Sequence, residues 1–292
     1  MESASARTVA VCGATGRQGS AVVRRLLERG FTVRALSRKP HRRAARALAA
    51  TGAEVVHADM NDEASLRRAF EGADGVYSVQ NGIASGFEAE VTQGRNVAQA
   101  AKAVGVTHVV YGSGGTGHAG TGVPSWESKV LVEAHMRLLE LPLTILRPLA
   151  FMELMTDASF YPAVGTWRIW PKLTGEDRPI PWLAVDDLGA VAAMAFENRD
   201  EWVGRQMTLA ADARSLAECR ALYRDAVGKE PRSVPLPIWL FDRFTRKDPT
   251  TMWRWLRTGT VELDLAEIRT VLPSALTVPD WLRATRRAAS PA

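Results

Sequence analysis

Three glycines stand three residues apart near the start of the chain, at positions 13, 16 and 19. An apolar, β-prone run precedes them and an amphipathic run follows. Because glycine has no Cβ, the backbone can turn sharply and approach a bound diphosphate, which the free N–H groups of the next helix would face. A turn that only packs tightly is the alternative. The place of the motif between strand and helix favours nucleotide binding by Gly13, Ala14, Thr15, Gly16, Arg17, Gln18 and Gly19.

The next β-prone run ends in Ser37, Arg38 and Lys39, at the point where dinucleotide-binding proteins distinguish NAD from NADP. A carboxylate there would accept hydrogen bonds from the ribose of NAD and repel a 2′-phosphate. This chain has no carboxylate at that point. Arg38 can make a planar, charge-assisted contact to a phosphate, and Lys39 can add a point charge. A solvated run of surface charge is the alternative, but the distance of about 20 residues from the glycines favours NADP(H).

Regular alternation of strands and helices must position these residues. The chain predicts strands at residues 8–12, 31–37, 53–58, 75–79, 108–113 and 143–148, with helical patterns between them. Right-handed parallel crossovers then give an α/β, Rossmann-like, doubly wound parallel sheet. Ligands bind such a sheet at the carboxyl ends of its strands, near the order reversal between the first and fourth. This places the following positions around one crevice: Gly13, Ser37, Asp59, Val79, Ser113 and Pro148.

Asp59 and Met60 end the third predicted strand, and we expect them to meet the adenine of the cofactor; turn formation and helix capping are the alternatives for Asp59. Asp62 can cap the helix that follows. We expect the nicotinamide to lie across the strand ends, between Val79 and Gln80 on one side and Pro148 and Phe151 on the other.

The second half of the chain has a looser pattern. It predicts a strand that feeds a helix capped by Asp187, a strand at residues 206–210, and a capping box formed by Ser215 and Glu218. The remainder, about 235–290, is helical in pattern and broken by prolines. No linker rich in glycine and serine separates the halves.

We therefore expect residues 1–150 to form the NADP-binding Rossmann core. Residues 151–292 form a mostly helical, substrate-covering region that contributes some elements back to the core and is not an independent domain. Tryptophans cluster in this region and predict either a packed core, the safer interpretation, or an aromatic wall of the substrate pocket: Trp167, Trp170, Trp182, Trp239, Trp253 and Trp255.

Several of these motifs resemble one family. They are Gly-Ala-Thr-Gly-Arg-Gln-Gly at 13–19, Ser-Arg-Lys-Pro at 37–40, Ala-Asp-Met at 58–60, Gly-Arg-Asn-Val at 94–97, Val-Tyr-Gly-Ser at 110–113, Leu-Arg-Pro at 146–148 and Ala-Val-Asp-Asp-Leu-Gly at 184–189. Together they resemble the NmrA-like group of atypical short-chain dehydrogenases/reductases over about residues 8–230. The resemblance implies a Rossmann fold with NADP held at these positions. The group contains quinone and isoflavone-type reductases, and also regulators that bind NADP without catalysis.

Ser125 and Lys129 stand four residues apart at the start of a predicted helix, where typical short-chain dehydrogenases carry a tyrosine and a lysine. That spacing puts both side chains on one helix face, so the ammonium can lower the phenol pKa from about 10 and make it an acid–base. Serine is too weakly acidic and too short for this role. The departure puts alcohol–ketone chemistry in doubt, but Lys129 remains placed to bind the nicotinamide ribose and polarise a carbonyl. An exposed helix lysine is the alternative.

Other side chains are candidates for the missing acid. His118 lies in the glycine-rich loop after the fifth strand and is the best of them, because histidine titrates near neutral pH; Tyr161 comes second. Ser113 ends the fifth strand and is a further candidate at the same crevice, although a serine followed by glycines is often only part of a turn. The other histidines show no metal-ligand spacing, and no Gly-x-Ser-x-Gly nucleophile motif is present.

Composition excludes several classes of protein. The 292 residues are 46% hydrophobic and 24% charged, as in ordinary globular proteins, with no apolar run of the ~18–20 residues that span a bilayer. The net charge of +5 comes without the aromatic platform or recognition helix of a nucleic-acid binder. The two cysteines lie far apart, and the first residues lack the apolar core of a signal peptide. We expect a cytoplasmic protein, monomeric or homodimeric, without a bound metal, that binds neither membrane nor nucleic acid.

These observations predict an NADPH-dependent oxidoreductase that transfers hydride to a conjugated or aromatic small molecule, such as a quinone or enone. Hydride transfer to a quinone gives a stabilised anion that water can protonate, so the missing tyrosine would be tolerable, and Lys129 would stabilise the developing oxyanion. The alternative is a non-catalytic NADP(H)-binding redox sensor that signals through a protein partner.

Overall fold

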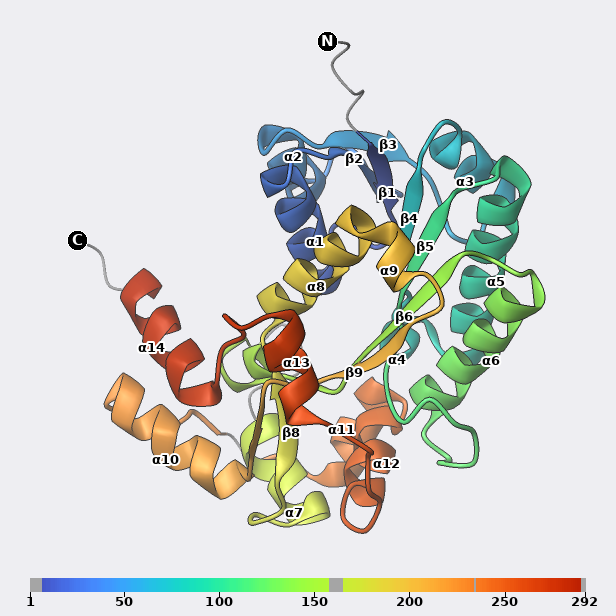
Figure 1. The fold of residues 1–292 in the computed structure, drawn as a ribbon. Coiled ribbons are helices and arrows are strands. Elements are labelled where there is room, and N and C mark those ends of the chain that lie inside the picture. The colour runs from blue at the N-terminus through green and yellow to red at the C-terminus, as the bar shows by residue number, and fades with distance from the viewer. Residues whose placement is uncertain (1–6, 158–164, 234, 290–292) are drawn as a thin grey trace.

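The computed structural model describes residues 7–157, 165–233 and 235–289. Within these ranges one parallel sheet has the strand order β3-β2-β1-β4-β5-β6-β9 (Figure 1). The predicted α/β doubly wound sheet is confirmed, with its order reversal between the first and fourth strands. Its strands are β1 (Thr8–Val11), β2 (Thr32–Ser37), β3 (Glu54–His57), β4 (Gly75–Ser78), β5 (His108–Gly112), β6 (Leu143–Pro148) and β9 (Gln206–Leu209).

Helices cover both faces of the sheet. One face is covered by α1 (Arg17–Glu28), α2 (Arg43–Ala50) and α8 (Val185–Glu197), and the other by α3 (Glu63–Phe70), α5 (Phe87–Val104) and α6 (Pro124–Leu138). Glycines let the paired helices approach closely. A Cβ on Gly189 of α8 would lie 2.8 Å from the Ala21 backbone of α1, and one on Gly94 of α5 would lie 2.4 Å from Val132 of α6. The strands between these layers are therefore buried on both faces, as their apolar sequences require.

Residues of the second half return to the sheet. The predicted strand at 206–210 is β9, and it pairs in parallel with β6. The sequence did not predict the small second sheet, β10-β8-β7, because two of its strands are only two and three residues long. Its strands are β7 (Ala150–Phe151), β8 (Ile180–Leu183) and β10 (Asp212–Arg214).

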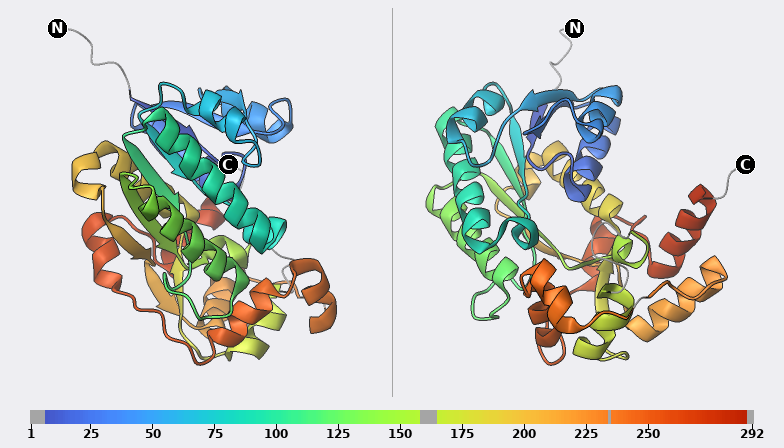
Figure 2. Two further views of the ribbon diagram at one scale, coloured as in Figure 1. Left: turned by 90° about the vertical axis from the view of Figure 1, so that its right-hand side faces the viewer. Right: turned by 180° about the vertical axis from the view of Figure 1, so that it is seen from behind.

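Short helices complete the second half: η1 (Met152–Met155), the π-helical turn η2 (Gly165–Ile169), α7 (Trp170–Thr174), α9 (Arg199–Trp202), α10 (Leu216–Val227), α11 (Ile238–Thr245), α12 (Asp248–Trp255), α13 (Leu265–Val271) and α14 (Val278–Ala289). Helices α7, α11 and α12 lie below the sheet in all three views of Figures 1 and 2, at the end where α4 (Gly82–Ser85) follows β4. This is the carboxyl end of the strands, so the second half covers the predicted crevice. None of the described helices has both the length and the apolar character that crossing a bilayer requires.

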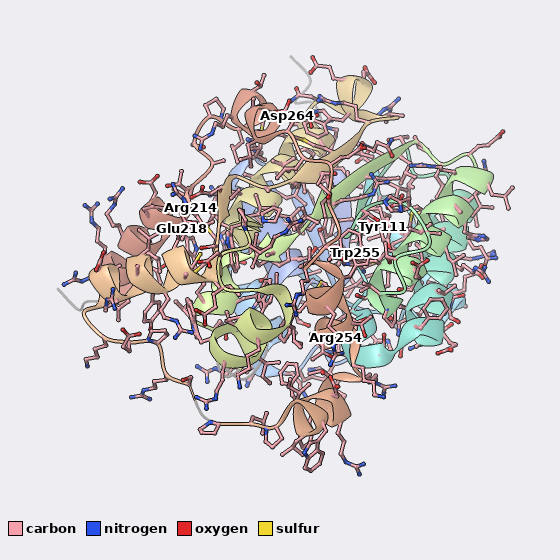
Figure 3. The ribbon with its side chains drawn as sticks, turned by 90° about the horizontal axis from the view of Figure 1, so that it is seen from below. Tyr111, Arg214, Glu218, Arg254, Trp255 and Asp264 are labelled. Carbon is pink, nitrogen blue, oxygen red and sulfur yellow. The ribbon has the colours of Figure 1, made fainter. Side chains whose placement is uncertain are left out.

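Helix termini confirm most of the predicted caps. The Asp62 carboxylate accepts the Ser65 N–H at 3.2 Å at the start of α3. Ser215 and Glu218 form the predicted capping box of α10, where Glu218 also lies beside Arg214 (Figure 3). The predicted cap at Asp187 is wrong, because α8 begins two residues earlier, at Val185.

The carboxylate that caps α8 comes from elsewhere in the chain. Glu153 of η1 accepts the Val185 N–H at 3.1 Å, so the helix does not need Asp187 at its start. The Asp187 carboxylate instead accepts the Leu276 N–H at 2.9 Å and ties the segment before α14 to α8.

The tryptophans of the second half mainly form a core. Trp170 stacks on Trp253 with ring centroids 5.2 Å apart, and Trp253 stacks on Phe241 at 5.5 Å. Trp182 is fully buried beside Trp170. The core-filling interpretation is therefore confirmed for these residues. Trp239, by contrast, is 69% exposed and lies outside this core.

Candidate active site at the carboxyl ends of the strands

The glycine turn between β1 and α1 is folded tightly on itself. Gly13 has a left-handed φ of +63°, and its carbonyl accepts the Gly16 N–H at 2.9 Å. A Cβ on Gly19 would lie 2.3 Å from the Gly13 oxygen, and one on Gly13 would lie 3.0 Å from Val79 of the neighbouring strand. The neighbouring atoms would have to move if either glycine were replaced by a larger residue.

The helix that follows this turn suits an anionic ligand. Gly16 is its N-cap and offers no side-chain oxygen, and the first turn carries no acidic residue. Thr15 and Gly16 are exposed at the mouth of the turn. Backbone N–H groups of the first helical turn, without a carboxylate to satisfy them, attract a diphosphate. The residues present therefore fit a dinucleotide.

The two side chains after Gly16 hold the loop to the rest of the protein. The Arg17 guanidinium forms an ion pair with Asp157, which follows η1, with Nε 2.8 Å from the carboxylate. Gln18 accepts the Tyr77 hydroxyl at 3.3 Å. The loop thus contacts both β4 and the first residues of the second half.

The predicted NADP-selective residues lie at the end of β2, beside β1 in the sheet. The Ser37 hydroxyl accepts the Lys39 N–H at 3.2 Å and so shapes the turn. Arg38 and Lys39 are exposed, and neither takes part in an ion pair among the residues that the structure describes. Their charges are therefore available to a ligand phosphate.

The turn after β3 shows what the Asp59 carboxylate does in the protein alone. Its Oδ1 accepts both the backbone N–H and the side-chain amide of Asn61, each at 2.9 Å, so it forms a turn. The Met60 carbonyl accepts the Asn96 amide of α5 at 2.9 Å. The adenine contact by Asp59 and Met60 remains a prediction. The turn that carries both residues is fixed by these hydrogen bonds.

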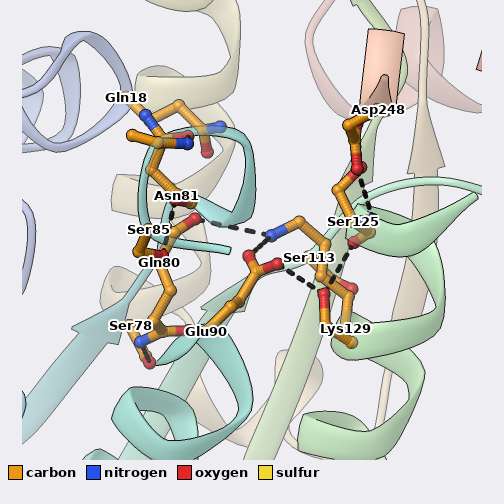
Figure 4. A network of polar contacts seen from close by, with 12 residues as sticks. Gln18, Ser78, Gln80, Asn81, Ser85, Glu90, Ser113, Ser125, Lys129 and Asp248 are labelled. Carbon is orange, nitrogen blue, oxygen red and sulfur yellow. Dashed lines mark hydrogen bonds and ion pairs between the residues drawn. The ribbon is translucent and has the colours of Figure 1, made fainter. Parts of the chain in front are cut away.

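Lys129 on α6 is held in the protein rather than exposed (Figure 4). Its ammonium forms an ion pair with Glu90 of α5 and donates to the Gln80 carbonyl after β4 at 3.4 Å. The Lys129 side chain is 12% exposed and that of Glu90 is completely buried. Ser128 also donates to Glu90. An exposed helix lysine, the alternative interpretation, is therefore wrong.

Sequence reasoning missed Glu90. The signal was present, because Glu90 falls on the same helical stripe as Gly94, Ala98 and Ala101, which forms the buried face of α5. A carboxylate on an apolar face requires a buried cationic or hydrogen-bonding partner. No pattern within α5 identifies that partner as Lys129, because the two lie on different helices.

Ser125 is occupied by a partner that is distant in sequence. Its N–H and its hydroxyl donate to the two oxygens of Asp248 at 2.7 and 2.8 Å (Figure 4). Asp248 is 3% exposed at the start of α12, and this burial raises the pKa of its carboxyl. The serine that replaces the tyrosine thus anchors the second half to the first turn of α6.

A ring contact and a strained turn accompany this anchor. Trp126 meets Trp255 of α12 edge to face, with centroids 5.0 Å apart; Trp255 is labelled in Figure 3. Arg246 and Lys247, just before Asp248, both have left-handed φ angles, +55° and +62°. Such conformations are costly for residues other than glycine and persist where surrounding contacts hold them.

The other candidate acids have different surroundings. The Ser113 hydroxyl donates at 2.6 Å to Glu133, which is buried in an ion pair with Arg147, so the geometry gives Ser113 a structural role. His118 is exposed, and its ring contacts the Ala119 carbonyl at 3.2 Å. The structure does not bring either residue into a described contact with Lys129. Tyr161 lies outside the described residues.

The expected nicotinamide positions lie at the ends of β4 and β6. Val79 packs against the glycine turn, and the Gln80 amide donates to Ser78 at 2.9 Å while its oxygen is buried without a described partner. Pro148 and Phe151 are buried, and Phe151 pairs with Leu183 of β8. Pro148 ends β6 of the seven-stranded sheet, and Phe151 lies in β7 of the small second sheet.

The chain resembles known proteins in sequence and in fold. A model of the NmrA-like family matches residues 5–263. The chain belongs to the NmrA-like family. The resemblance of its motifs to this family is thereby confirmed.

Two curated relatives of this NmrA-like protein are oxidoreductases by name. The NmrA-like family domain-containing oxidoreductase FrzB of Cladobotryum sp is 31% identical over 79% of this chain and 77% of its own. The oxidoreductase himF of Aspergillus japonicus is 31% identical over 78% of this chain and 75% of its own.

Solved structures show the same fold. NmrA, described as a negative transcriptional regulator, aligns in its NADP complex with a TM-score of 0.77 and 21% identity, over 98% of this chain and 97% of NmrA. The Citrobacter sp. triphenylmethane reductase complexed with NADP(H) aligns with a TM-score of 0.72 and 18% identity, over 96% of this chain and 99% of its own. An enzyme and a regulator thus share this architecture.

Proposed function

We propose that this NmrA-like protein is an NAD(P)H-dependent oxidoreductase that reduces a conjugated or aromatic acceptor, such as a quinone or an enone. The observation that carries the proposal is the Lys129 ammonium, held by Glu90 and the Gln80 carbonyl at the strand end where we expect the crevice. The relatives FrzB and himF are named as oxidoreductases, and the structural neighbour from Citrobacter reduces triphenylmethane dyes.

Different residues around the predicted crevice would hold different parts of the cofactor. The turn at residues 13–19 would hold the diphosphate, and Ser37, Arg38 and Lys39 the 2′-phosphate of NADP. Asp59 and Met60 would border the adenine. The nicotinamide and its ribose would lie against Val79, Gln80, Lys129, Pro148 and Phe151.

The bound cofactor supplies a hydride, and the protein must then stabilise the negative charge on the acceptor. The Lys129 ammonium does so electrostatically, and such stabilisation is strong where water is excluded. Ser125 does not supply the proton, because its hydroxyl is committed to Asp248. A quinone or enone suits this site, since its reduced anion is stabilised by conjugation and takes its proton from water.

Turnover with a panel of acceptors tests the proposal. We expect the purified protein to oxidise NADPH in the presence of at least one quinone or enone, followed by the absorbance of the reduced cofactor. Tight binding of NADPH without acceptor-dependent oxidation anywhere in the panel would contradict it.

A test of the role of Lys129 in turnover requires a double substitution. Lys129→Met alone leaves Glu90 as an uncompensated buried charge, which costs about 3–5 kcal/mol and confuses folding with catalysis. The double variant Lys129→Met/Glu90→Gln removes both charges and should fold, bind NADPH and lose most of its turnover. Unchanged turnover in this variant would remove Lys129 from the mechanism.

A second candidate is a non-catalytic NADP(H)-binding sensor that signals through a protein partner. The Ser125–Asp248 contact favours it, because the usual acid–base position is used here to join two parts of the molecule. The same fold serves a regulator in NmrA. Tight NADPH binding, no turnover, and a partner whose affinity changes between NADP⁺ and NADPH would support the sensor over the enzyme.

A further inference from the structure

The Glu90 carboxylate is enclosed by groups that donate to it and by a glycine that leaves room for it. Its side chain is completely buried between α5, α6 and α4, where Lys129 and Ser128 both donate to it. A Cβ on Gly82 of α4 would lie 1.9 Å from the Glu90 carboxylate oxygen, so only glycine leaves room at that position. Figure 4 shows Glu90 directed at the Lys129 ammonium, next to the Gln80 carbonyl.

The charges around this ion pair are mostly acidic. Asp248 faces it from α12 and interacts electrostatically with both Lys129 and Glu90. The Tyr111 hydroxyl faces Glu90 from β5 and is buried without a described partner, and Glu133 on α6 is balanced by Arg147. Nearby, the Arg246 guanidinium approaches Gly86 at the start of α5. The Lys129 ammonium is the cation that balances the buried Glu90 carboxylate.

We propose that Glu90 is a positioning residue that holds the Lys129 ammonium at the carboxyl end of β4, so that Lys129 acts as a fixed positive charge and not as a proton donor. The inference rests on the proposed reductase function. Glu90 has no access to the acceptor, since it is completely buried, and it therefore acts only through Lys129.

The reaction balances without a proton from Lys129. The acceptor gains a hydride, with its two electrons, from the reduced cofactor that the proposed function supplies. Its oxyanion then gains a proton as an O–H bond of water breaks, and hydroxide leaves to solvent. Lys129 keeps its three N–H bonds throughout, and one of them remains directed at Glu90.

The hold of Glu90 on the Lys129 ammonium is measurable without cofactor or acceptor. We expect competitive labelling of lysines with acetic anhydride at one fixed pH, read by mass spectrometry, to modify Lys129 more slowly than the exposed Lys39. Glu90→Gln keeps the shape and an accepting oxygen but removes the charge. It should raise the labelling rate of Lys129 several-fold, because the ion pair that holds its ammonium is lost.

Controls are present in the same sample. Lys39 is exposed at the end of β2 and should label identically in both proteins. Glu88→Gln, on the exposed side of α5, should leave the labelling rate of Lys129 unchanged, and Glu90→Asp, which keeps the charge, should keep Lys129 labelling slow. An unchanged labelling rate of Lys129 in folded Glu90→Gln would overturn the proposal.

If Glu90→Gln does not fold, Gly82→Ala displaces the carboxylate while keeping its charge, and it should likewise raise the labelling rate of Lys129. An unchanged labelling rate in folded Gly82→Ala would count against the proposal. Once an acceptor is known, Glu90→Gln should lower kcat and Glu90→Asp should restore most of it, whereas a purely structural role would not require a charge at position 90. Absence of turnover in every protein would contradict the reductase function, yet the labelling result would still decide the role of Glu90.

Discussion

Arg38 is the residue that most directly decides which cofactor this protein prefers. It is exposed at the end of β2, next to the glycine turn, and its charge is not compensated by a described ion pair. Hydrogen bonds to a charged group are worth about 1.5–3 kcal/mol, so the contact with a 2′-phosphate should contribute roughly 10- to 150-fold in affinity.

We therefore predict that Arg38→Ala weakens NADPH binding by about this factor and changes NADH binding little, as measured by titration calorimetry. Arg43→Ala, which removes an exposed arginine from the start of α2, serves as the matched control. Equal losses of affinity for NADPH and NADH would refute the assignment.

Local sequence motifs identify some residues of the candidate site and leave others unrecognised. Gly13, Arg38 and Lys129 could be found because each stands at a fixed distance from a local motif. The roles of Glu90 and Asp248 could not, since each acquires its role from a partner on another helix. For Glu90, the sequence signals only a carboxylate on an apolar helix face that needs some buried partner. Sequence reasoning recognised that Ser125 departs from the usual tyrosine, but only the structure shows what its hydroxyl contacts.

Helix α12 is the element that joins the second half of the chain to the candidate site. It contributes Asp248 to Ser125 and Trp255 to Trp126, and both contacts fall on the first turn of α6, one turn before Lys129. The left-handed residues Arg246 and Lys247 bring the helix to this position. Docking of α12 thus fixes the start of the helix that carries Lys129.

We predict that Asp248→Ala lowers the free energy of unfolding by about 1–3 kcal/mol, because two buried donors of Ser125 lose their acceptor. Ser125→Ala in the Asp248→Ala background should cost much less than in the wild-type protein, as a double-mutant cycle in urea would show. Trypsin should also cleave after Arg246 or Lys247 faster in Asp248→Ala. Strictly additive losses would indicate that the two residues act independently.

Strand and helix patterns predicted the elements of the first half well, since buried parallel strands and amphipathic helices produce strong periodicity. The second half was harder to predict. Its small sheet uses strands too short to show a pattern, and the true cap of α8, Glu153, lies far from that helix in sequence. Long-range caps of this kind leave no local signal.

At the scale of the whole molecule, Glu153 joins η1 to α8 and α14. It accepts the Val185 N–H, and it interacts with Trp281 of α14. Burial raises the pKa of Glu153 to about 7, and the charge of Asp187 adds to the effect. Burial likewise raises the pKa of Asp187 to about 6. Both groups therefore favour the folded state when they are protonated.

The stability of the protein should therefore depend on pH. A group whose pKa is raised on folding stabilises the protein below its unfolded pKa, about 4.5 for Glu153, and that stabilisation is lost as the pH rises to about 7. The buried His108, whose pKa is lowered to about 4, acts in the opposite direction below pH ~6.5. A comparison of variant with wild type cancels the contribution of His108.

We predict that Glu153→Gln, which keeps an acceptor for Val185, is more stable than the wild type at pH 8 and that this difference shrinks toward pH 5. The change should approach ~1.4 kcal/mol for each unit by which folding raises the pKa of Glu153. Urea denaturation at several pH values measures it, with Glu88→Gln as an exposed control. A difference that does not depend on pH would show that Glu153 titrates normally.

The pairing of β9 with β6 has a consequence for dividing the chain. Residues 1–150 expressed alone would leave β6 as an unpaired edge strand and uncover the face of α1 that α8 buries. Exposed edges of this kind recruit other chains, so this fragment should form insoluble aggregates through edge-to-edge pairing. Co-expression with residues 151–292 should restore a soluble complex, measured by the fraction of protein in the supernatant. Such reassembly would make the two segments a split-protein pair. Their association would restore the pairing of β9 with β6 and complete the predicted crevice.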